Sequence, residues 1–481
     1  MTRRLAVAAL ALLAGGCALG PNYKRPAVPT PPNWRDMPVA EAQTLANKPW
    51  WELFDDPQLQ ELIRIALVEN KDLKIAVERI EEARARYGLT KADLWPKVDL
   101  NTTVGGLRFN SGSLVHTPDA DTGGAVAPTE TAVYSLTADM SWEIDFFGRI
   151  RRATEAQKAL FLGTLEARRS TVLTLVADLA RAYFELRAFD LQLEIARRTL
   201  VSRREYLELA RDRFEGGLTP EVDLRQAEAE LLRIEVVTYD LALRIRQAEN
   251  LISILIGRNP GPVLRGRAVT EQKQPAAVPA GLPSELLDRR PDVRVAEQNL
   301  AAATANIGQA KALLFPRIAL TGSFGFTSTE FDTWFDGPSK AWNILGNLLQ
   351  PIFNAGKNRR RVEITESQQR QTLYEYERTI LQAFRETEDA LVAYQKTGEQ
   401  RAAQARRVGA ERKVLDLAEL RYRGGVAAYL EVLDAQRSLF GAEIDETQTI
   451  TANLVSLVQL YKALGGGWPP AADTPPDPSG P

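Results

Sequence analysis

Apolar and polar residues alternate along four short segments of the chain. The clearest segment runs from Ala132 to Asp145, where every second residue is apolar and those between are mostly polar. Similar alternation starts at Val98 and at Ile318, and a fourth, less regular segment lies near residues 342–353. A period of two predicts β-strands with one apolar face and one polar face.

The length of these segments bears on where the strands lie. About 14 alternating residues are many for a soluble strand, and they fit a tilted strand with lipid on one side and water on the other. The edge of a soluble β-sandwich is the alternative. The polar, Gly- and Thr-rich residues 105–131 and 328–340 are expected to form hairpin loops outside the cell, with His116 as a solvated residue of the first loop.

A second pattern, with a period of 3.5 residues, predicts a long helix from about Arg149 to Glu215. The residues on this period are Val172, Val176, Leu179, Tyr183, Leu186, Leu193 and Leu200. Such a helix would be about 100 Å long, which is far more than an ordinary globular domain needs.

The chain also repeats itself once. Residues 72–100 align with residues 292–320 at an offset of 220, and Gly148 onwards aligns with Gly356 onwards at an offset of 208. Each copy is expected to run helix, strand, loop, strand, long helix, turn, helix. The flanking helices, predicted at 57–92 and 219–256, together match the long helix in length. They could therefore stack end to end along it, as could those at 284–312 and 427–464 along a second long helix at 357–423.

Membrane insertion by these strands requires more than one chain. Beyond the N-terminus no stretch of about 20 apolar residues is present, so strands must make any span of the membrane. Four strands are too few to close a barrel, because the smallest membrane barrels have about eight. The barrel must be shared between at least two chains, and this argument leaves their number open.

The N-terminus predicts export and lipid attachment. Residues 1–16 have the basic start, the apolar run and the small residues of a secretory signal peptide. They end at Cys17, the only cysteine of the chain, in a sequence that resembles a bacterial lipobox. We expect N-acyl and S-diacylglycerol groups on Cys17, sorting to the outer membrane because residue 18 is Ala, and a lipidated segment over 17–56. The Pro-rich residues 469–481 are expected to be disordered.

Composition argues against other classes of function. Lys and Arg number 60 against 62 Asp and Glu, so the basic surplus of a nucleic-acid-binding protein is absent. One Cys and one His leave little for a metal site, and no cofactor is expected besides the lipid. We expect the protein not to be an enzyme. A hydrolase that uses Glu143 and Asp145 as paired carboxylates is a remote alternative, because the second repeat has no matching acid pair.

Several motifs together resemble those of TolC-type outer-membrane efflux proteins, the outer membrane factors, and in particular the lipidated OprM-like (NodT) branch that serves RND efflux systems. They cover nearly the whole mature chain. These motifs are Cys17 with residues 20–26, Trp50-Trp51 with Phe54 and Asp56-Pro57, residues 145–149, 421–425, 433–439 and 461–468.

The resemblance implies an α+β membrane protein of two tandem repeats, at residues 57–270 and 271–468. Long coiled-coil helices would form a periplasmic α-barrel, and four strands per chain would contribute to a shared 12-stranded trimeric β-barrel. The protein would be a lipid-anchored channel of the bacterial outer membrane with a long periplasmic extension. It would act as a passive conduit for small molecules that an inner-membrane RND pump exports through a periplasmic adaptor.

The resemblance also assigns residues. The two helical turns would lie at the periplasmic end and contact the adaptor through Arg213, Gly216, Gly217, Leu218, Arg421, Gly424, Gly425 and Val426. Gly allows the left-handed turn that reverses a helical hairpin. Where many relatives carry an acidic gate residue this chain has Ala427-Ala428, and Glu431 is the next acid. Glu431, Asp434 and Arg437 are expected to pack between helices near the gate, with a possible helix pair between Asp434 and Arg437.

Two other functions stay open at this point. One is an exit duct for type I protein secretion, although the lipobox and the Trp50-Trp51 region favour efflux. The other is a structural coiled-coil lipoprotein that tethers the envelope. A tether would not need the membrane-type alternation at 132–145 and 318–326.

Overall fold

The computed structural model describes residues 18–35, 47, 54–109, 129–272, 281 and 283–466. Cys17, Trp50-Trp51, His116, the signal peptide and the Pro-rich tail lie outside these residues. The chain divides into two compact units. The first comprises residues 1–26, 81–162 and 297–374, and the second comprises residues 27–80, 163–296 and 375–481.

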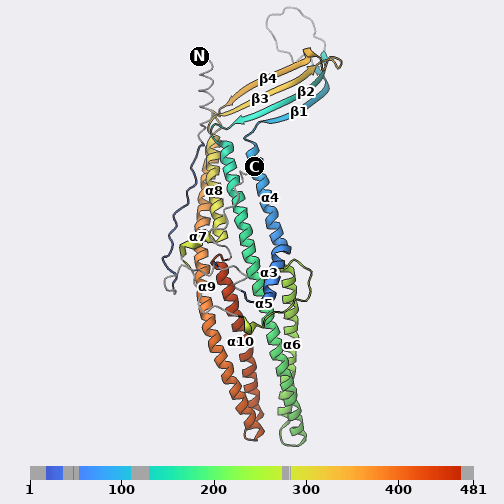
Figure 1. Cartoon of the computed structure of the whole chain (residues 1–481), viewed down its shortest axis with the longest axis vertical. Helices are drawn as coiled ribbons and strands as arrows, with labels where there is room; N and C mark the ends of the chain where they lie inside the picture. Colours follow the sequence, from blue (N-terminus) through green and yellow to red (C-terminus); the bar gives the residue numbers. More distant parts are fainter. Residues whose placement is uncertain are drawn as a thin grey trace, which may run out of the picture. The chain divides into compact units, whose positions relative to one another are not determined.

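The first unit contains a four-stranded antiparallel sheet in the order β1-β2-β3-β4 (Figure 1). The strands are β1 (Lys97–Phe109), β2 (Thr129–Ile144), β3 (Arg317–Ser328) and β4 (Lys340–Leu349). β2 of the first repeat pairs directly with β3 of the second, so the two repeats share one sheet.

The first hairpin is longer than the sequence predicts. The expected loop at 105–131 is wrong at both ends, because β1 continues to Phe109 and β2 starts at Thr129. The pairing extends through Gly105 opposite Val133 and Gly106 opposite Ala132, since backbone hydrogen bonds tolerate small residues that weaken the side-chain pattern. The fourth strand also lies earlier than expected, at 340–349, and ends before Pro351, which lacks a donor N–H.

The second unit is helical. The helices are α3 (Pro57–Glu69), α4 (Lys71–Ala92), α5 (Arg149–Glu215), α6 (Glu221–Leu255), α7 (Leu286–Arg289), α8 (Pro291–Ala312), α9 (Lys357–Arg423) and α10 (Tyr429–Ala463). Four of them, α4, α5, α8 and α9, also contribute residues to the first unit. Short 3₁₀ turns lie at Val269–Glu271, Pro283–Glu285 and, in the first unit, Gly337–Ser339. α5 and α9 are both 67 residues long, which confirms the two predicted long helices. α6 folds back along α5, and α10 along α9 (Figure 1).

Each predicted helix before the strands is broken into two. The expected continuous helix 57–92 is wrong, because Asn70 ends α3 and its side-chain oxygen accepts a hydrogen bond from the backbone N–H of Leu73 in α4. The expected helix 284–312 breaks at Arg290, since Pro291 restricts the residue before it and cannot donate a helical hydrogen bond. The break at Asn70 lies beside the end of α6, and the break at Arg290 lies beside the end of α10.

The core of the second unit lies where α3, α5 and α10 pack together. Residues at the centre of the predicted period on α5 are buried, with Leu179, Tyr183 and Leu186 each 0% exposed. The Tyr183 hydroxyl donates to Asp56, which is also fully buried and accepts from the Gln272 side chain and the Arg267 backbone N–H. Burial, together with the nearby Asp56 charge, raises the pKa of Tyr183. This network fixes the segment after α6 against the core.

Candidate functional site

The register of the sheet collects the predicted apolar positions on one face. Residues directly opposite each other on antiparallel strands point to the same side, and Val98 lies opposite Met140, Ala138 opposite Phe324, and Phe324 opposite Trp342. The face consists of Val98, Leu100, Val104, Tyr134, Leu136, Ala138, Met140, Trp142, Ile144, Ile318, Leu320, Phe324, Phe326, Trp342, Ile344 and Leu348. Much of it is exposed: Trp342 is 71% and Leu348 68% accessible. An apolar surface of this extent marks a contact with lipid or with another protein.

The opposite face of the sheet is mostly polar, although β4 contributes Leu345 and Leu349 to it. Asp99 lies opposite Asp139, and the Asn101 side chain donates a hydrogen bond of 2.5 Å to Asp139. Thr137 also bonds Asp139, and Ser135 is within 3.4 Å of Thr327. One apolar and one polar face is the arrangement of a strand between lipid and water.

Glu143 and Asp145, the carboxylates of the hydrolase alternative, are both used by the turn from β2 into α5. Glu143 accepts two hydrogen bonds from Arg149, at 2.8 and 2.9 Å, and Asp145 accepts one from the backbone N–H of Arg151 at 2.8 Å. The Glu143 carboxylate is the main reason that the pKa of Arg149 is raised, although this guanidinium stays charged in any case. The two acids therefore fix a strand-to-helix turn.

The first described residues lie against this same turn. Ala18 packs on Gly148, which has a φ of +80°, and the Leu19 N–H donates to the Phe147 carbonyl at 3.3 Å. Arg152 of α5 is buried and donates to the carbonyls of Leu19 and Gly20. The chain directly after Cys17 is thus held where β2 ends.

Close backbone packing completes this strap, which we define as residues 18–26. Gly20 lies against Gly308 of α8, so closely that a Cβ on Gly20 would come within 2.4 Å of the Gly308 Cα. Further along, Tyr23 and Arg25 both reach Glu297, at 3.2 and 3.4 Å. The strap therefore depends on two glycines and on charged contacts to α8.

The two helical turns predicted to contact the adaptor have the same geometry. At the first, the Gly217 N–H donates to the Phe214 carbonyl and the Leu218 N–H to the Arg213 carbonyl; at the second, the same bonds run from Gly425 and Val426. This pattern of two backbone hydrogen bonds ends a helix with a left-handed residue. The second glycine of each pair has the positive φ, +69° at Gly217 and +73° at Gly425, as its lack of a side chain permits.

The side chains of the turns divide between contact and exposure. Leu218 is 77% and Val426 71% exposed. The Arg213 guanidinium lies 4.3 Å from the centre of the Tyr422 ring, which links α5 to α9, and Arg421 is 3.6 Å from Glu431 on α10. Two large apolar side chains are therefore left free at the turns, whereas the arginines make contacts within the chain.

The three residues expected to pack near the gate do not form one group. Glu431 faces Arg421, and Asp434 is exposed. The proposed helix pair between Asp434 and Arg437 is not formed, because Arg437 donates to Glu230 of α6 at 2.9 Å, across the two hairpins. Burial alone would raise the pKa of Glu230, but the hydrogen bonds from Arg437 and Arg233 outweigh it and lower the pKa.

Glu230 was missed by the sequence analysis, as was Arg203 on α5. Glu230 occupies a buried position of α6 at 2% exposure and lies 207 residues from Arg437 along the chain. A charged residue on the apolar face of an amphipathic helix is the signal that could have found it. The partner of Glu230 depends on how the two helical hairpins are aligned, and local periodicity does not predict that alignment.

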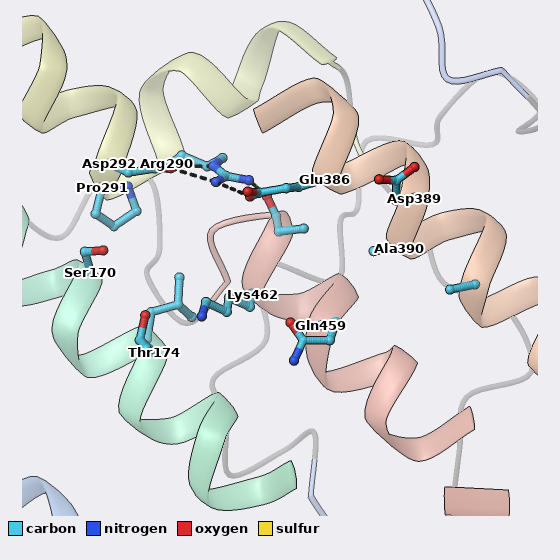
Figure 2. Close-up of a pocket in the computed structure, with 13 residues that line it drawn as sticks. Ser170, Thr174, Arg290, Pro291, Asp292, Glu386, Asp389, Ala390, Gln459 and Lys462 are labelled. Carbon is cyan, nitrogen blue, oxygen red and sulfur yellow. Dashed lines mark hydrogen bonds and ion pairs between the residues drawn. The ribbon is translucent and has the colours of Figure 1, made fainter. Parts of the chain in front are cut away.

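A cavity of about 440 Å³ lies beside the break before α8 (Figure 2). Arg290 extends from this break to Asp292 and to Glu386 of α9, each at 2.7 Å. Burial alone would lower the pKa of Arg290, but its bonds to Asp292 and Glu386 outweigh it and raise the pKa. The cavity lining therefore presents a cation that is already neutralised by its neighbours.

None of the helices described combines the length and the hydropathy that a bilayer-spanning helix needs. Within the described residues no group of three or more His, Cys, Asp or Glu side chains could hold a metal ion.

Comparison with known proteins settles the class of protein. The profile of the family described as outer membrane efflux protein matches residues 62–258 and 282–466. The chain belongs to this family. The two matched stretches lie within the two predicted repeats, whose outer bounds stay a prediction. Members of this family are channels rather than enzymes. This confirms the prediction that the protein is not an enzyme and excludes the hydrolase alternative.

Individual relatives are similar to this efflux protein over nearly its whole length. The Cation efflux system protein CusC of Escherichia coli O6:H1 is 35% identical over 469 residues, covering 95% of this chain and 97% of the relative. The Probable efflux pump outer membrane protein TtgC of Pseudomonas putida is 36% identical, covering 96% and 95%. The predicted function in outer-membrane efflux and the predicted outer-membrane localisation with a long periplasmic extension are confirmed, and the envelope tether is set aside. The lipid anchor stays a prediction.

Solved structures agree on the fold of this efflux protein. The outer-membrane channel OprN superposes with a TM-score of 0.86 at 30% identity, covering 94% of this chain and all of that one. The open state of the Neisseria gonorrhoeae MtrE outer membrane channel superposes with a TM-score of 0.82 at 31% identity, covering 94% and 98%. The coarser part of the predicted α+β class, long helices with a few strands, is confirmed.

Proposed function

We propose that three copies of this chain form the exit duct of a tripartite efflux system. Their strands would close a 12-stranded barrel in the outer membrane, and their helices would form a periplasmic tunnel. A periplasmic adaptor would connect the tunnel to an inner-membrane RND pump, which supplies the energy. The duct itself would be passive.

The observation that carries this proposal is the sheet with one apolar and one polar face. Its two outer strands, β1 and β4, have no partner on their outer edges among the described residues. In a bilayer such an edge leaves backbone groups unbonded, so β1 of one chain must pair with β4 of the next. Three sheets of four strands give 12, which lies in the range of known barrels, and two sheets give eight, the lower limit.

Exposed apolar side chains on the helices support assembly with further copies. On α6 the residues Val222, Val236 and Leu243 are between 55% and 66% exposed and fall on a seven-residue spacing. On α9, Leu417 and Leu420 are 62% and 69% exposed. A seven-residue apolar repeat that one chain leaves uncovered is typical of a coiled-coil seam, so we expect α6 to pack against α9 of a neighbouring copy.

The strap supports lipid attachment at Cys17. Ala18 is fixed against Gly148 where β2 ends, so an acyl chain on the preceding residue would leave the protein near the edge of the apolar face. Phe147 and Phe315 stack there at 5.0 Å, and Trp95, two residues before β1, is 72% exposed. Aromatic residues of this kind favour the membrane–water interface. Two or three acyl chains give a firm anchor.

The nature of the cargo does not follow from the similarity. CusC is named for cation efflux and another relative of 36% identity is named for toluene efflux, yet both match this chain about equally. We infer that the pump selects the cargo and that the duct accepts what the pump delivers.

Export in living cells tests this proposal. In bacteria that lack their own copy of the gene, the chain should restore efflux of a fluorescent pump substrate, and the double variant Leu218→Glu, Val426→Glu should not, because charged side chains would replace the apolar contacts to the adaptor. Leu264→Glu is the matched control, since Leu264 is 73% exposed in the segment after α6 and away from the turns. Normal efflux by the double variant at equal membrane levels would contradict the adaptor contact.

A further inference from the structure

A cavity of about 460 Å³ lies between α5 of the first hairpin and α9 and α10 of the second. Its lining is rich in hydrogen-bond donors. Those that matter here are Arg198, Thr199, Ser202, Arg203, Arg412 and Gln436.

Arg203 is buried and makes no side-chain hydrogen bond within the described residues. Its side chain is 2% exposed, and none of its three guanidinium nitrogens has a hydrogen-bond partner among the described residues. Burial lowers the pKa of Arg203, although the nearby negative charge of Glu230 acts in the opposite direction. Gln436, facing it from α10, is 6% exposed, and both atoms of its amide are likewise unpartnered within the described part of the chain. Buried polar groups in native proteins are almost always bonded, so a partner for these two side chains is missing.

The acids nearby are already neutralised. Glu443 at the cavity accepts from Arg198 at 2.7 Å and from Arg412 at 2.9 Å. Neither of its oxygens therefore needs a further cation.

Glu230 is engaged in the same way. One of its oxygens accepts from Arg233 at 3.0 Å and the other from Arg437 at 2.9 Å. The cavity lining itself holds one carboxylate, Glu443, and three guanidiniums, a surplus of two positive charges (3 − 1). The guanidiniums are those of Arg198, Arg203 and Arg412.

We propose that this cavity binds a small oxyanion, a phosphate or a carboxylate, with Arg203 and Gln436 as its main contacts. Water could satisfy their hydrogen bonds but not the charge, and a buried charge without a counter-ion is costly. A guanidinium matches the oxygens of phosphate and carboxylate with paired hydrogen bonds.

Two features of the cavity bear on how an anion would bind. The Thr199 and Ser202 hydroxyls supply further donors from α5. The nitrogens of Arg203 have almost no exposed surface, so the guanidinium must turn toward the cavity as the anion enters. Once bound, the anion would join α5 to α10 and so hold the two hairpins of one chain together. This inference goes beyond the role as a duct, which needs no ligand here.

Calorimetric titration of the full chain in detergent, at constant ionic strength kept with NaCl, tests this site. Inorganic phosphate and succinate are the two probes, and they distinguish the phosphate from the carboxylate form of the ligand. We expect saturable binding of at least one probe, about one per chain, and a loss of affinity of at least tenfold in Arg203→Met. Arg204→Met is the matched control, because Arg204 is the next residue and is exposed.

Gln436→Met provides a second variant in case Arg203→Met fails to assemble, and it should weaken binding severalfold. Two results would overturn the proposal. One is that neither probe binds saturably to the wild-type chain. The other is that the variants bind as tightly as the wild type. Because purified protein is used, neither result depends on whether the chain exports anything.

Discussion

Asn70 and Arg290 stand at the same position of the two repeats, and each donates a hydrogen bond to the end of a helix. The Asn70 side-chain amide donates to the Leu255 carbonyl at 2.9 Å, where α6 ends. The Arg290 guanidinium donates to the Ala463 carbonyl at 3.1 Å, where α10 ends. Each repeat therefore joins two shorter helices end to end beside a long one. A neutral side chain makes the junction in the first repeat and a charged one makes it in the second.

The junction of the first repeat also requires a glycine. Gly257 has a φ of +73°, and a Cβ there would come within 2.3 Å of the Glu69 carbonyl oxygen. We predict that Gly257→Ala lowers the free energy of unfolding by more than about 2 kcal/mol, through left-handed strain and a clash together. Gly217→Ala is the control: its φ is +69° but its surroundings are open, so only strain of about 1–2 kcal/mol applies. Chemical unfolding of both variants measures the difference, and equal losses would show that the junction is not tightly packed.

The strap should depend on Gly308. A Cβ there would lie 2.5 Å from the Leu19 carbonyl oxygen and 2.9 Å from Arg152, so Gly308→Ala should displace residues 18–26. The equivalent residue of the first repeat is Gly88 (308 − 220), which has nothing within 4 Å of an added Cβ. Limited proteolysis should cut the strap several times faster in Gly308→Ala than in wild type or Gly88→Ala. Identical cleavage of all three proteins would refute the close packing.

The two faces of the sheet should respond differently to charge. Leu136 belongs to the apolar face and Thr137 to the polar face of β2. We expect Leu136→Arg to cost about 2–4 kcal/mol in the middle of the membrane, and Thr137→Arg to be tolerated. The amount of assembled protein in the outer membrane of cells expressing each variant is the measurement. Equal tolerance of both substitutions would count against the membrane assignment.

The contact between Glu230 and Arg437 should make hairpin stability depend on pH. The pKa of Glu230 is lowered in the folded chain, so its stabilising contribution is complete above the unfolded value, about 4.3, and is lost as pH falls through the folded value. We predict that the wild-type midpoint of thermal unfolding falls more steeply below pH 4 than that of Glu230→Gln. Above pH 6 the difference between the two proteins should be constant. If the midpoints of the two proteins change in parallel over the whole pH range, the Glu230 carboxylate is not the source of the pH dependence.

Much of the fold follows from local pattern. Helix α5 was predicted with the right ends because Gly148 and the Gly216-Gly217 pair interrupt the helical sequence on both sides. The apolar face of the sheet was predicted because strand side chains alternate strictly, whichever strand is the neighbour. The break at Asn70 was missed, because the apolar period of α3 and α4 continues across it and the asparagine that ends α3 resembles any polar helix residue.

The contacts between hairpins could not be predicted in the same way. Arg437 had a candidate partner one turn away in Asp434, but its actual partner Glu230 is 207 residues distant. Arg203 resembles a solvated residue of an amphipathic helix, and only the packing of α10 over it reveals a buried charge. The exposed residues at the turns, Leu218 and Val426, were found because two adjacent glycines mark each turn in the sequence.

A native mass of the protein, extracted from its own membrane in mild detergent, tests the shared barrel most directly. We predict three chains, each heavier than residues 17–481 by an acylated glyceryl group at Cys17. A complex of three chains without the lipid would retain the barrel and remove the anchor. A monomer would contradict the account, because four strands cannot close a barrel in a membrane.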